Sequence, residues 1–169
     1  MKHEELKNIL FEISGPSDSD YAKDEEKCRS VTGKVGNFEG VPISANSKMQ
    51  ERTALSVSES EAIAGSADAQ DMLFAASIVE SIGLKVKYPM TLFIDNRGAI
   101  DLFNNYSVGG RTRHMQARVW FMRDLREQGK MIYKWIRSED NYTDIFTKNL
   151  DGATYNKHAQ HFVGKDKYM

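Results

Sequence analysis

Four acidic residues stand at or near the ends of segments that a single fold could bring together. They are Asp18, Glu61, Asp95 and Asp144. Clustered carboxylates repel one another and raise each other's pKa unless a cation neutralises them. Oxygen ligands without a His or Cys cluster suit magnesium or manganese better than zinc. Two such ions about 3.5–4 Å apart can hold an attacking water and stabilise the leaving oxygen in phosphodiester hydrolysis, so the acids predict this chemistry if the fold gathers them.

Each acid also has a purely structural interpretation. Glu61 stands three residues after Ser58, which is the spacing of a helix capping box. Asp95 could close a turn, and Asp144 could interact with the dipole of a helix. Asp18 lies in an acid-rich segment where solvated carboxylates are expected. Taken singly, each acid favours the structural interpretation, whereas the four together, in this order along the predicted elements, favour the metal site.

The N-terminal third of the sequence predicts three strands. Residues 9–17 begin with alternating apolar side chains, which is the periodicity of a strand. Residues 31–38 and 41–47 are β-rich and flank Glu39-Gly40, a hairpin signal. We therefore expect antiparallel pairing in this part of the chain.

The rest of the sequence alternates helices with strands. A long helix is expected to begin near Ser58 and to end at Gly83, with Ile63, Ala67, Phe74, Ile78 and Ile82 recurring at helical spacing. Helical crossovers would make the later strands parallel. The later elements are expected at 90–94 (strand), 97–103 (helix), Thr112 to Gly129 (helix), 131–136 (strand), and 139–148 (helix capped by Ser138). In the helix from Thr112 to Gly129, one face is lined by Met115, Val119, Met122 and Leu125. The pattern predicts an α/β domain over residues 9–150, with an extension at 1–8 and a weakly patterned C-terminal tail at 151–169.

Composition is that of one globular domain, with 169 residues, 40% hydrophobic and 28% charged. No run approaches the roughly 18 apolar residues of a membrane span, so we expect no membrane partner. Cys28 is the single cysteine, and the polar, acid-containing N-terminus is unlike a signal peptide. These features predict a reducing, cytoplasmic location.

Net charge is −1, which by itself argues against a nucleic-acid partner. Residues 111–137, however, hold eight Lys/Arg and two Asp/Glu. Such a basic block is what local contact with phosphates requires. A solvated helix face is the alternative interpretation, and charge alone slightly favours it.

Five segments carry a family resemblance. They are SDSDYAKDEEKCRSVTGKV, PISANSKMQERTALSVSESEAIAGSADAQDMLF, LFIDNRGAIDLFNN, GGRTRHMQARVWFMRDL and NYTDIFTKNL. Together, from about residue 10 to 150, they resemble the ribonuclease H domain that ends copia-type retrotransposon Pol polyproteins. The most specific pieces are T-R-H at 112–114 and T-D-I-F-T-K at 143–148.

The resemblance implies a ribonuclease H-like fold, with a five-stranded mixed sheet (three antiparallel strands, then two parallel) flanked by helices. It implies an endonuclease that cuts the RNA strand of RNA–DNA hybrids with two Mg²⁺ ions, for which Mn²⁺ can substitute. The implied ligands and catalytic residues are Asp18 (or Asp20 in its place), Glu61, Asp95 and Asp144. A reverse transcriptase domain upstream in the polyprotein is the implied partner, and the cytoplasm or a retrotransposon particle the implied location.

Substrate contacts are expected from basic and polar residues near these acids. His114 matches a histidine of the family and could contact phosphate or assist product release, although a structural role at a helix N-terminus is at least as well supported. Trp120 and Trp135 lie among apolar positions and are expected in the core. The full set of candidate nucleic-acid contacts is Asn96, Arg97, Arg111, Arg113, His114 and Arg118.

Two departures from the family pattern bear on the site. Pro16 stands two residues before Asp18, where proline is expected to end the first strand early. Ala62 replaces a larger residue after Glu61 and is expected to thin the packing there. These departures keep open a second hypothesis, a catalytically silent module that binds nucleic acid or protein. An integrase-like enzyme is disfavoured, because such enzymes place their glutamate last and Glu61 precedes Asp95.

Overall fold

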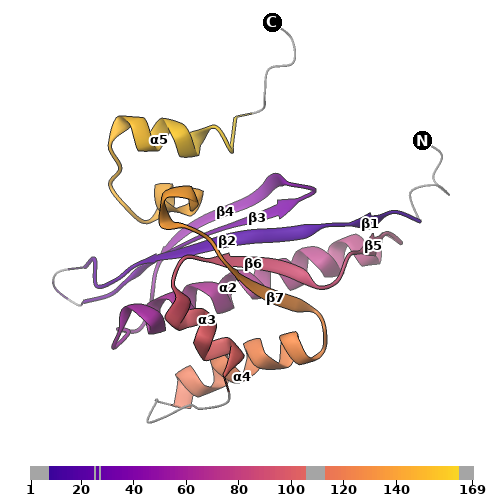
Figure 1. Ribbon diagram of the computed structural model, residues 1–169, viewed down its shortest axis with the longest axis horizontal. Coiled ribbons are helices and arrows are strands. Elements are labelled where there is room, and N and C mark those ends of the chain that lie inside the picture. The colour runs from indigo at the N-terminus through magenta and orange to yellow at the C-terminus, as the bar shows by residue number, and fades with distance from the viewer. Residues whose placement is uncertain (1–7, 25, 27, 106–112, 164–169) are drawn as a thin grey trace, which may run out of the picture.

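A five-stranded mixed sheet in the order β4-β3-β2-β6-β7 forms the centre of the molecule (Figure 1). The computed structural model describes residues 8–24, 26, 28–105 and 113–163. Strand β2 pairs antiparallel with β3, which pairs antiparallel with β4, whereas β6 is parallel to both β2 and β7. The predicted mixed sheet is confirmed. Its strands are β2 (Ile13–Asp20), β3 (Val31–Phe38), β4 (Val41–Met49), β6 (Met90–Ile94) and β7 (Met131–Trp135).

Three α-helices cover one face of this sheet, and shorter helical segments lie on the other (Figure 1). The first group is α2 (Val57–Ser81), α3 (Arg97–Asn104) and α4 (Arg113–Glu127). The second face carries the 3₁₀ helix η2 (Tyr142–Phe146) and helix α5 (Gly152–Ala159), and a further 3₁₀ turn, η1 (Ser138–Asp140), follows β7. Two 3₁₀ turns thus replace the single helix predicted at 139–148. Within the described ranges, no helix has both the length and the apolar character to cross a membrane.

Helix α5 lies inside the C-terminal tail at 151–169, whose weak sequence pattern predicted no element there. Asp151 caps the helix through its Oδ1, which accepts hydrogen bonds from the backbone of Ala153 and Thr154 at 2.9 and 3.0 Å. The chain after α5 returns to η2, where His161 stacks on Tyr142 with ring centroids 4.3 Å apart. Aromatic contacts therefore hold this segment against the domain. A second small sheet, also not predicted, pairs β1 (Leu10–Phe11) in parallel with β5 (Lys85–Val86).

Helix α2 packs on the sheet through small side chains. The apolar series expected to face the core ends in Phe74, Ile78 and Ile82, yet these are exposed, Phe74 by 68%. A Cβ at Gly65 would lie 3.2 Å from Cδ1 of Ile94, which shows how closely helix and strand approach. The buried positions of α2 include Ala62, Ala64, Ala69, Met72, Ala76 and Val79. The small size of Ala62 therefore suits this close packing.

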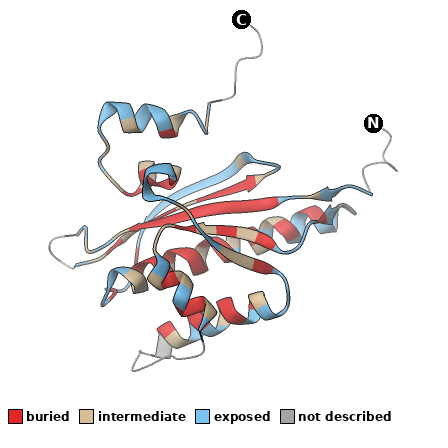
Figure 2. Cartoon of the chain, in the orientation of Figure 1, coloured by how far each residue is buried: buried red, intermediate tan, exposed pale blue. Residues whose placement is uncertain are grey.

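Strand β2 runs through the middle of the sheet without a break at Pro16. In the pairing of β2 with β3, Ser14 lies opposite Asn37 and the next paired residue of β2 is Ser17, opposite Lys34. The ladder between these two strands therefore passes over Pro16. On the other side Pro16 lies opposite Phe93 of β6. The predicted early end of this strand was wrong, because the sheet tolerates the missing donor by omitting a local pair. Figure 2 shows that β2 is buried along most of its length.

Helix α4 buries its predicted apolar face, since Met115, Val119, Met122 and Leu125 are all in the core. Trp120, on the opposite side of α4, is 54% exposed, and Trp135 at the end of β7 is 44% exposed. The prediction that both tryptophans lie in the core was therefore wrong. The expected N-cap of this helix, Thr112, lies outside the described residues.

Candidate metal centre

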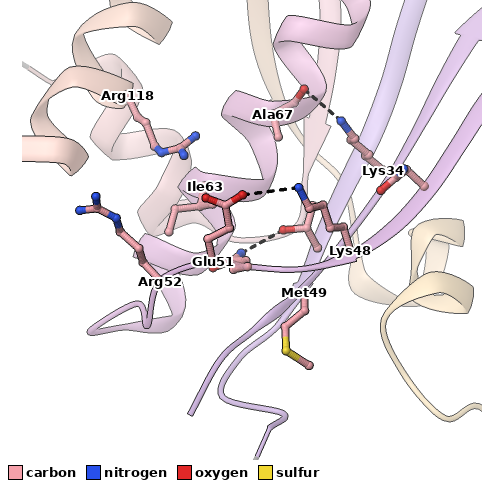
Figure 3. Close-up of a pocket in the computed structure, with 11 residues that line it drawn as sticks. Lys34, Lys48, Met49, Glu51, Arg52, Ile63, Ala67 and Arg118 are labelled. Carbon is pink, nitrogen blue, oxygen red and sulfur yellow. Dashed lines mark hydrogen bonds and ion pairs between the residues drawn. The ribbon is translucent and has the colours of Figure 1, made fainter. Parts of the chain in front are cut away.

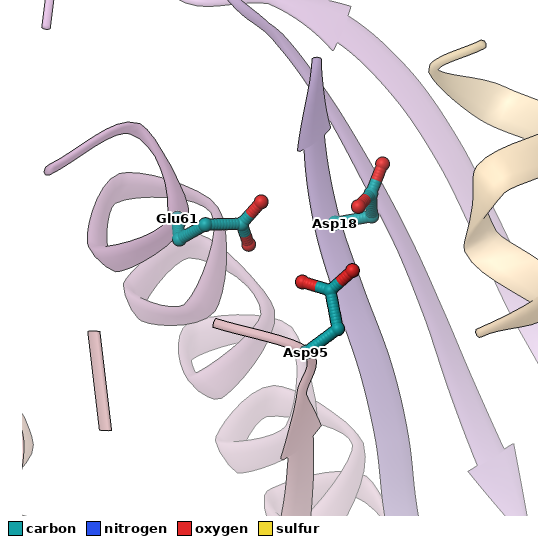
Figure 4. Close-up of side chains that lie close together, drawn as sticks. All are labelled: Asp18, Glu61 and Asp95. Atoms are coloured by element: carbon teal, nitrogen blue, oxygen red, sulfur yellow. The ribbon is translucent and has the colours of Figure 1, made fainter. Parts of the chain in front are cut away.

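Asp18, Glu61 and Asp95 come together at one edge of the sheet (Figure 4). Each offers a carboxylate oxygen, and the three oxygens lie within 4.8 Å of one another. Because β2 and β6 are parallel neighbours, Asp18 near the end of β2 and Asp95 just after β6 emerge at the same edge. Helix α2 crosses beneath the sheet and brings Glu61 to the other two carboxylates (Figure 4).

Glu61 is not the glutamate of a capping box. The N-cap of helix α2 is Ser56, two residues before the predicted start at Ser58. Oγ of Ser56 accepts a hydrogen bond from the backbone N–H of Glu59 at 3.2 Å. The carboxylate of Glu59 in turn accepts from the backbone N–H of Leu55 at 2.9 Å. The capping box therefore uses Glu59 and leaves Glu61 available for the site.

One oxygen of Glu61 is held in place and the other is left without a partner. The backbone N–H and the Oγ of Ser19 donate to Oε1 at 3.0 and 2.9 Å. The residue is only 2% exposed, and its buried Oε2 has no hydrogen-bond partner among the described residues. Burial, then the charges of Asp18 and Asp95, raise the pKa of Glu61 well above its usual value. A buried, unpaired carboxylate oxygen beside two other acids fits a bound cation.

Asp95 is oriented by two residues, one at the end of β7 and one just after it. Ser138, predicted as a helix cap, instead donates from Oγ to Oδ2 of Asp95 at 2.9 Å. The indole N–H of Trp135 donates to the backbone carbonyl of Asp95 at 3.0 Å. Burial and the neighbouring Asp18 raise the pKa of Asp95. These contacts fix the position of a carboxylate that a cation would neutralise.

The fourth predicted acid, Asp144, joins the site through a lysine. Lys148 Nζ lies 2.8 Å from Oδ1 of Asp144 and 3.1 Å from Oδ1 of Asp18, and Thr147 Oγ1 donates to the other oxygen of Asp18. Burial raises the pKa of Asp144 to about 6, against the effect of Lys148. Burial alone would lower the pKa of Lys148, but the charge of Asp18 and the bond to Asp144 raise it.

Asp20, the alternative first ligand, lies outside this group. Its carboxylate pairs with Lys23 at 2.9 Å, and it is not among the acids whose oxygens converge. Among the two candidates in this strand, the geometry favours Asp18.

The candidate substrate contacts beside Asp95 have defined neighbours. Asn96 is the N-cap of α3, since its Oδ1 accepts from the backbone N–H of Ala99 at 2.9 Å. The guanidinium of Arg97 lies over the ring of Trp135, 4.5 Å from its centroid. Arg97 is thus held at the rim of the site by a cation–π contact.

Nη1 of Arg118, on α4, donates a hydrogen bond to Oγ of Ser66 at 2.9 Å. Arg118 also lines a groove over helix α2 (Figure 3). The candidates Arg111, Arg113 and His114 cannot be placed in the same way: Arg111 lies outside the described residues, and so do the side chains of the other two, which open α4.

The groove has a volume of about 280 Å³ and is rich in cations (Figure 3). Lys34 bonds to Asp71 at 2.6 Å, and the exposed Lys48 lies 3.7 Å from Glu51. Its four cations, Lys34, Lys48, Arg52 and Arg118, outnumber the single acid of the lining, Glu51. Lys34, Lys48 and Arg52 lie outside the basic block at residues 111–137, from which the sequence predicted phosphate contact.

Sequence reasoning missed the contacts of Lys148, Ser138 and the groove cations. For Lys148 a local signal exists, because it stands four residues after Asp144, a spacing that places two side chains on one helical face. Ser138 and Lys34 carry no comparable signal, since their partners are far away in the sequence.

No protein-family model matches the chain. The chain is 31% identical over 136 residues to the retrovirus-related Pol polyprotein from transposon TNT 1-94 of Nicotiana tabacum, and the match covers 80% of this chain. It spans only about 10% of the length of that relative.

Solved structures show the fold. LC11-RNase H1, isolated from compost by a metagenomic approach, matches with a TM-score of 0.61 at 13% identity, covering 80% of this chain and 92% of that chain. LC11-RNase H1 in complex with an RNA/DNA hybrid matches with a TM-score of 0.56 at 12% identity, covering 77% and 88%. The ribonuclease H-like fold implied by the sequence motifs is confirmed.

Proposed function

The chain belongs to the retrovirus-related Pol polyproteins of copia-type retrotransposons, and we propose that it is their ribonuclease H, which hydrolyses the RNA strand of RNA–DNA hybrids. The observation that carries this proposal is the convergence of Asp18, Glu61 and Asp95 around a buried carboxylate oxygen without a partner. A set of hard oxygen donors without histidine or cysteine suits Mg²⁺, with Mn²⁺ as a substitute.

The residues of the chain have separate tasks in this proposal. Divalent ions held by Asp18, Glu61, Asp95 and Asp144 would supply an activated water and stabilise the leaving 3′-oxygen. Ser19 holds one oxygen of Glu61 and leaves the other free for a ligand bond. Ser138 orients Asp95 in the same way. Such outer partners fix the direction of ligand atoms before the substrate arrives.

The substrate class is supported by charge and by the fold. The groove cations and Arg97 offer positive charge to backbone phosphates. A protein of the same fold, LC11-RNase H1, has been solved with an RNA/DNA hybrid. The candidates Asn96, Arg111, Arg113, His114 and Arg118 remain proposals for phosphate or sugar contact.

The partner and location follow from the family. We propose that a reverse transcriptase domain of the same polyprotein delivers the hybrid, since the chain spans about 10% of its Pol relative. Reverse transcription would then place the domain in the cytoplasm, within retrotransposon particles.

The test is cleavage of an end-labelled RNA–DNA hybrid with Mg²⁺ and then Mn²⁺. Wild type should cut only the RNA strand and only with metal. Asp95→Asn should lose at least about a hundredfold in rate, because even outer partners of metal ligands typically cost ten- to a hundredfold. Asp101→Asn, the same change at an exposed position of α3, is the matched control and should keep full activity.

Two results would contradict the proposal. Cutting that persists in Asp95→Asn would move the chemistry away from this site. Absence of cleavage in either metal by folded wild-type protein, with hybrid binding retained, would favour a catalytically silent binding module.

A further inference from the structure

A lysine ammonium occupies the space between two of the site's carboxylates. Lys148 Nζ lies 3.1 Å from Asp18 and 2.8 Å from Asp144. The two carboxylates are nearly buried, with side chains 1% and 11% exposed, whereas the lysine side chain is 33% exposed. A cation is therefore already built into this half of the site.

The other half of the site has no such cation among the described residues. Asp18 is shared, because it belongs both to the group of Asp18, Glu61 and Asp95 and to the ion pair with Lys148. Oε2 of Glu61 is unpartnered, while the oxygens of Asp18 are engaged by Lys148 and Thr147. The two halves thus differ in whether a positive charge is present.

Nζ of Lys148 and a divalent ion cannot share one position. Mg²⁺ lies about 2.0–2.1 Å from its oxygen ligands, so an ion bound by both Asp18 and Asp144 would need the space that Nζ fills. Two positive charges at that distance also repel strongly. A second ion can enter only after the lysine has moved, and its flexible, partly exposed stem allows that movement.

We propose that Lys148 is a built-in cation that fills the second metal position, so that the chain binds one divalent ion readily and the second only by displacing the lysine. The inference rests on the proposed metal site but not on the choice of substrate. The cost of displacement lowers the affinity for the second ion, because only the fraction of molecules with Lys148 displaced is competent to bind it.

Mn²⁺ binding without substrate tests the proposal, with bound and free ion counted by electron paramagnetic resonance. Wild type should bind one ion tightly and a second at least about tenfold more weakly, and Lys148→Gln should tighten the second ion by about tenfold or more. Lys148→Met carries the same expectation and is measured in case Lys148→Gln does not fold. Lys157→Gln, which removes an equal charge from an exposed pair with Asp140, should bind as wild type does.

Each outcome decides a different point. Two equally tight ions in wild type, or an unchanged second ion in the folded Lys148 variants, would overturn the role of Lys148 and leave it a structural counterion. Lys148→Arg keeps the charge and should keep the weak second ion. Failure of wild type to bind any Mn²⁺ would instead overturn the metal site and with it the proposed function.

Discussion

At the scale of single residues, two buried carboxyl groups of α2 differ in their hydrogen-bond partners and in their surroundings. Glu61 has two fixed donors from Ser19 and lies beside other acids at an open edge. Asp68, two turns further along, is fully buried, and neither of its oxygens has a hydrogen-bond partner among the described residues. A bound cation can neutralise the first carboxylate, whereas the second carries a desolvation cost that the charge of Lys34 offsets only in part.

Asp68 contributes to the pH dependence of stability. Burial raises its pKa well above the usual value, with Lys34 acting against the shift and Asp71 adding to it. A carboxyl with a raised folded pKa stabilises the fold below its unfolded pKa of about 3.9, and this contribution is lost as pH rises through the folded pKa.

Asp68→Asn should therefore gain stability relative to wild type as pH rises from about 4 to about 8, because the amide cannot ionise in its buried position. Urea unfolding of metal-free protein at both pH values measures the change. Asp101→Asn serves as the exposed control. An Asp68→Asn difference that is the same at both pH values would show that Asp68 titrates normally.

At the scale of elements, the start of α2 decides which glutamate serves the site. The pair Ser56 and Glu59 closes the first turn, and the buried Ser60 and Glu61 follow it directly. A cap two residues later would have used Glu61 itself. Helix capping and site assembly are therefore linked in one short stretch of sequence.

Ser56→Ala should destabilise the protein by about 1 kcal/mol, because the backbone N–H of Glu59 loses its acceptor. Ser77→Ala on the same helix is the control: within the described part of the chain, Oγ of Ser77 bonds only to the carbonyl of Phe74, and alanine is the better helix former. Chemical denaturation of both variants gives the comparison. Equal losses in the two variants would refute the cap at Ser56.

The sequence predicted the elements best where periodicity is strong. The mixed sheet, the Glu39-Gly40 turn and the buried face of α4 came out as expected. The buried face of α2 did not, because close helix–sheet contact selects Gly and Ala, which carry little hydrophobic signal. The three acids at the sheet edge could be predicted from their places at element ends, whereas the roles of Lys148 and Ser138 depend on pairing across the chain.

At the scale of the whole molecule, a net charge of −1 conceals a separation of charge. The acids converge at one sheet edge, and cations gather in the groove over α2 (Figure 3). We expect a duplex whose cleaved strand lies at the acids to bring some of its other phosphates to this groove. Salt dependence measures that contact directly, since each phosphate contact releases counterions.

Replacing both Lys48 and Arg52 with Gln should weaken hybrid binding and reduce the slope of log affinity against log salt by about one to two. Fluorescence anisotropy in the Asp95→Asn background avoids cleavage. Lys87→Gln, which removes a cation paired with Glu12 near the small β1–β5 sheet, should leave the slope unchanged. A double variant with the wild-type slope would place the nucleic acid elsewhere.

The ion pair between Asp18 and Lys148 also has a consequence for folding. It joins residues 130 positions apart, so the loop that it closes includes nearly every strand and helix of the domain. Contacts of such sequence separation pay a large chain entropy and are expected to form late. We therefore expect Asp144 and Lys148 to reach their positions after the sheet has formed. Local unfolding of η2 would then separate these two residues from Asp18 while the sheet stays folded.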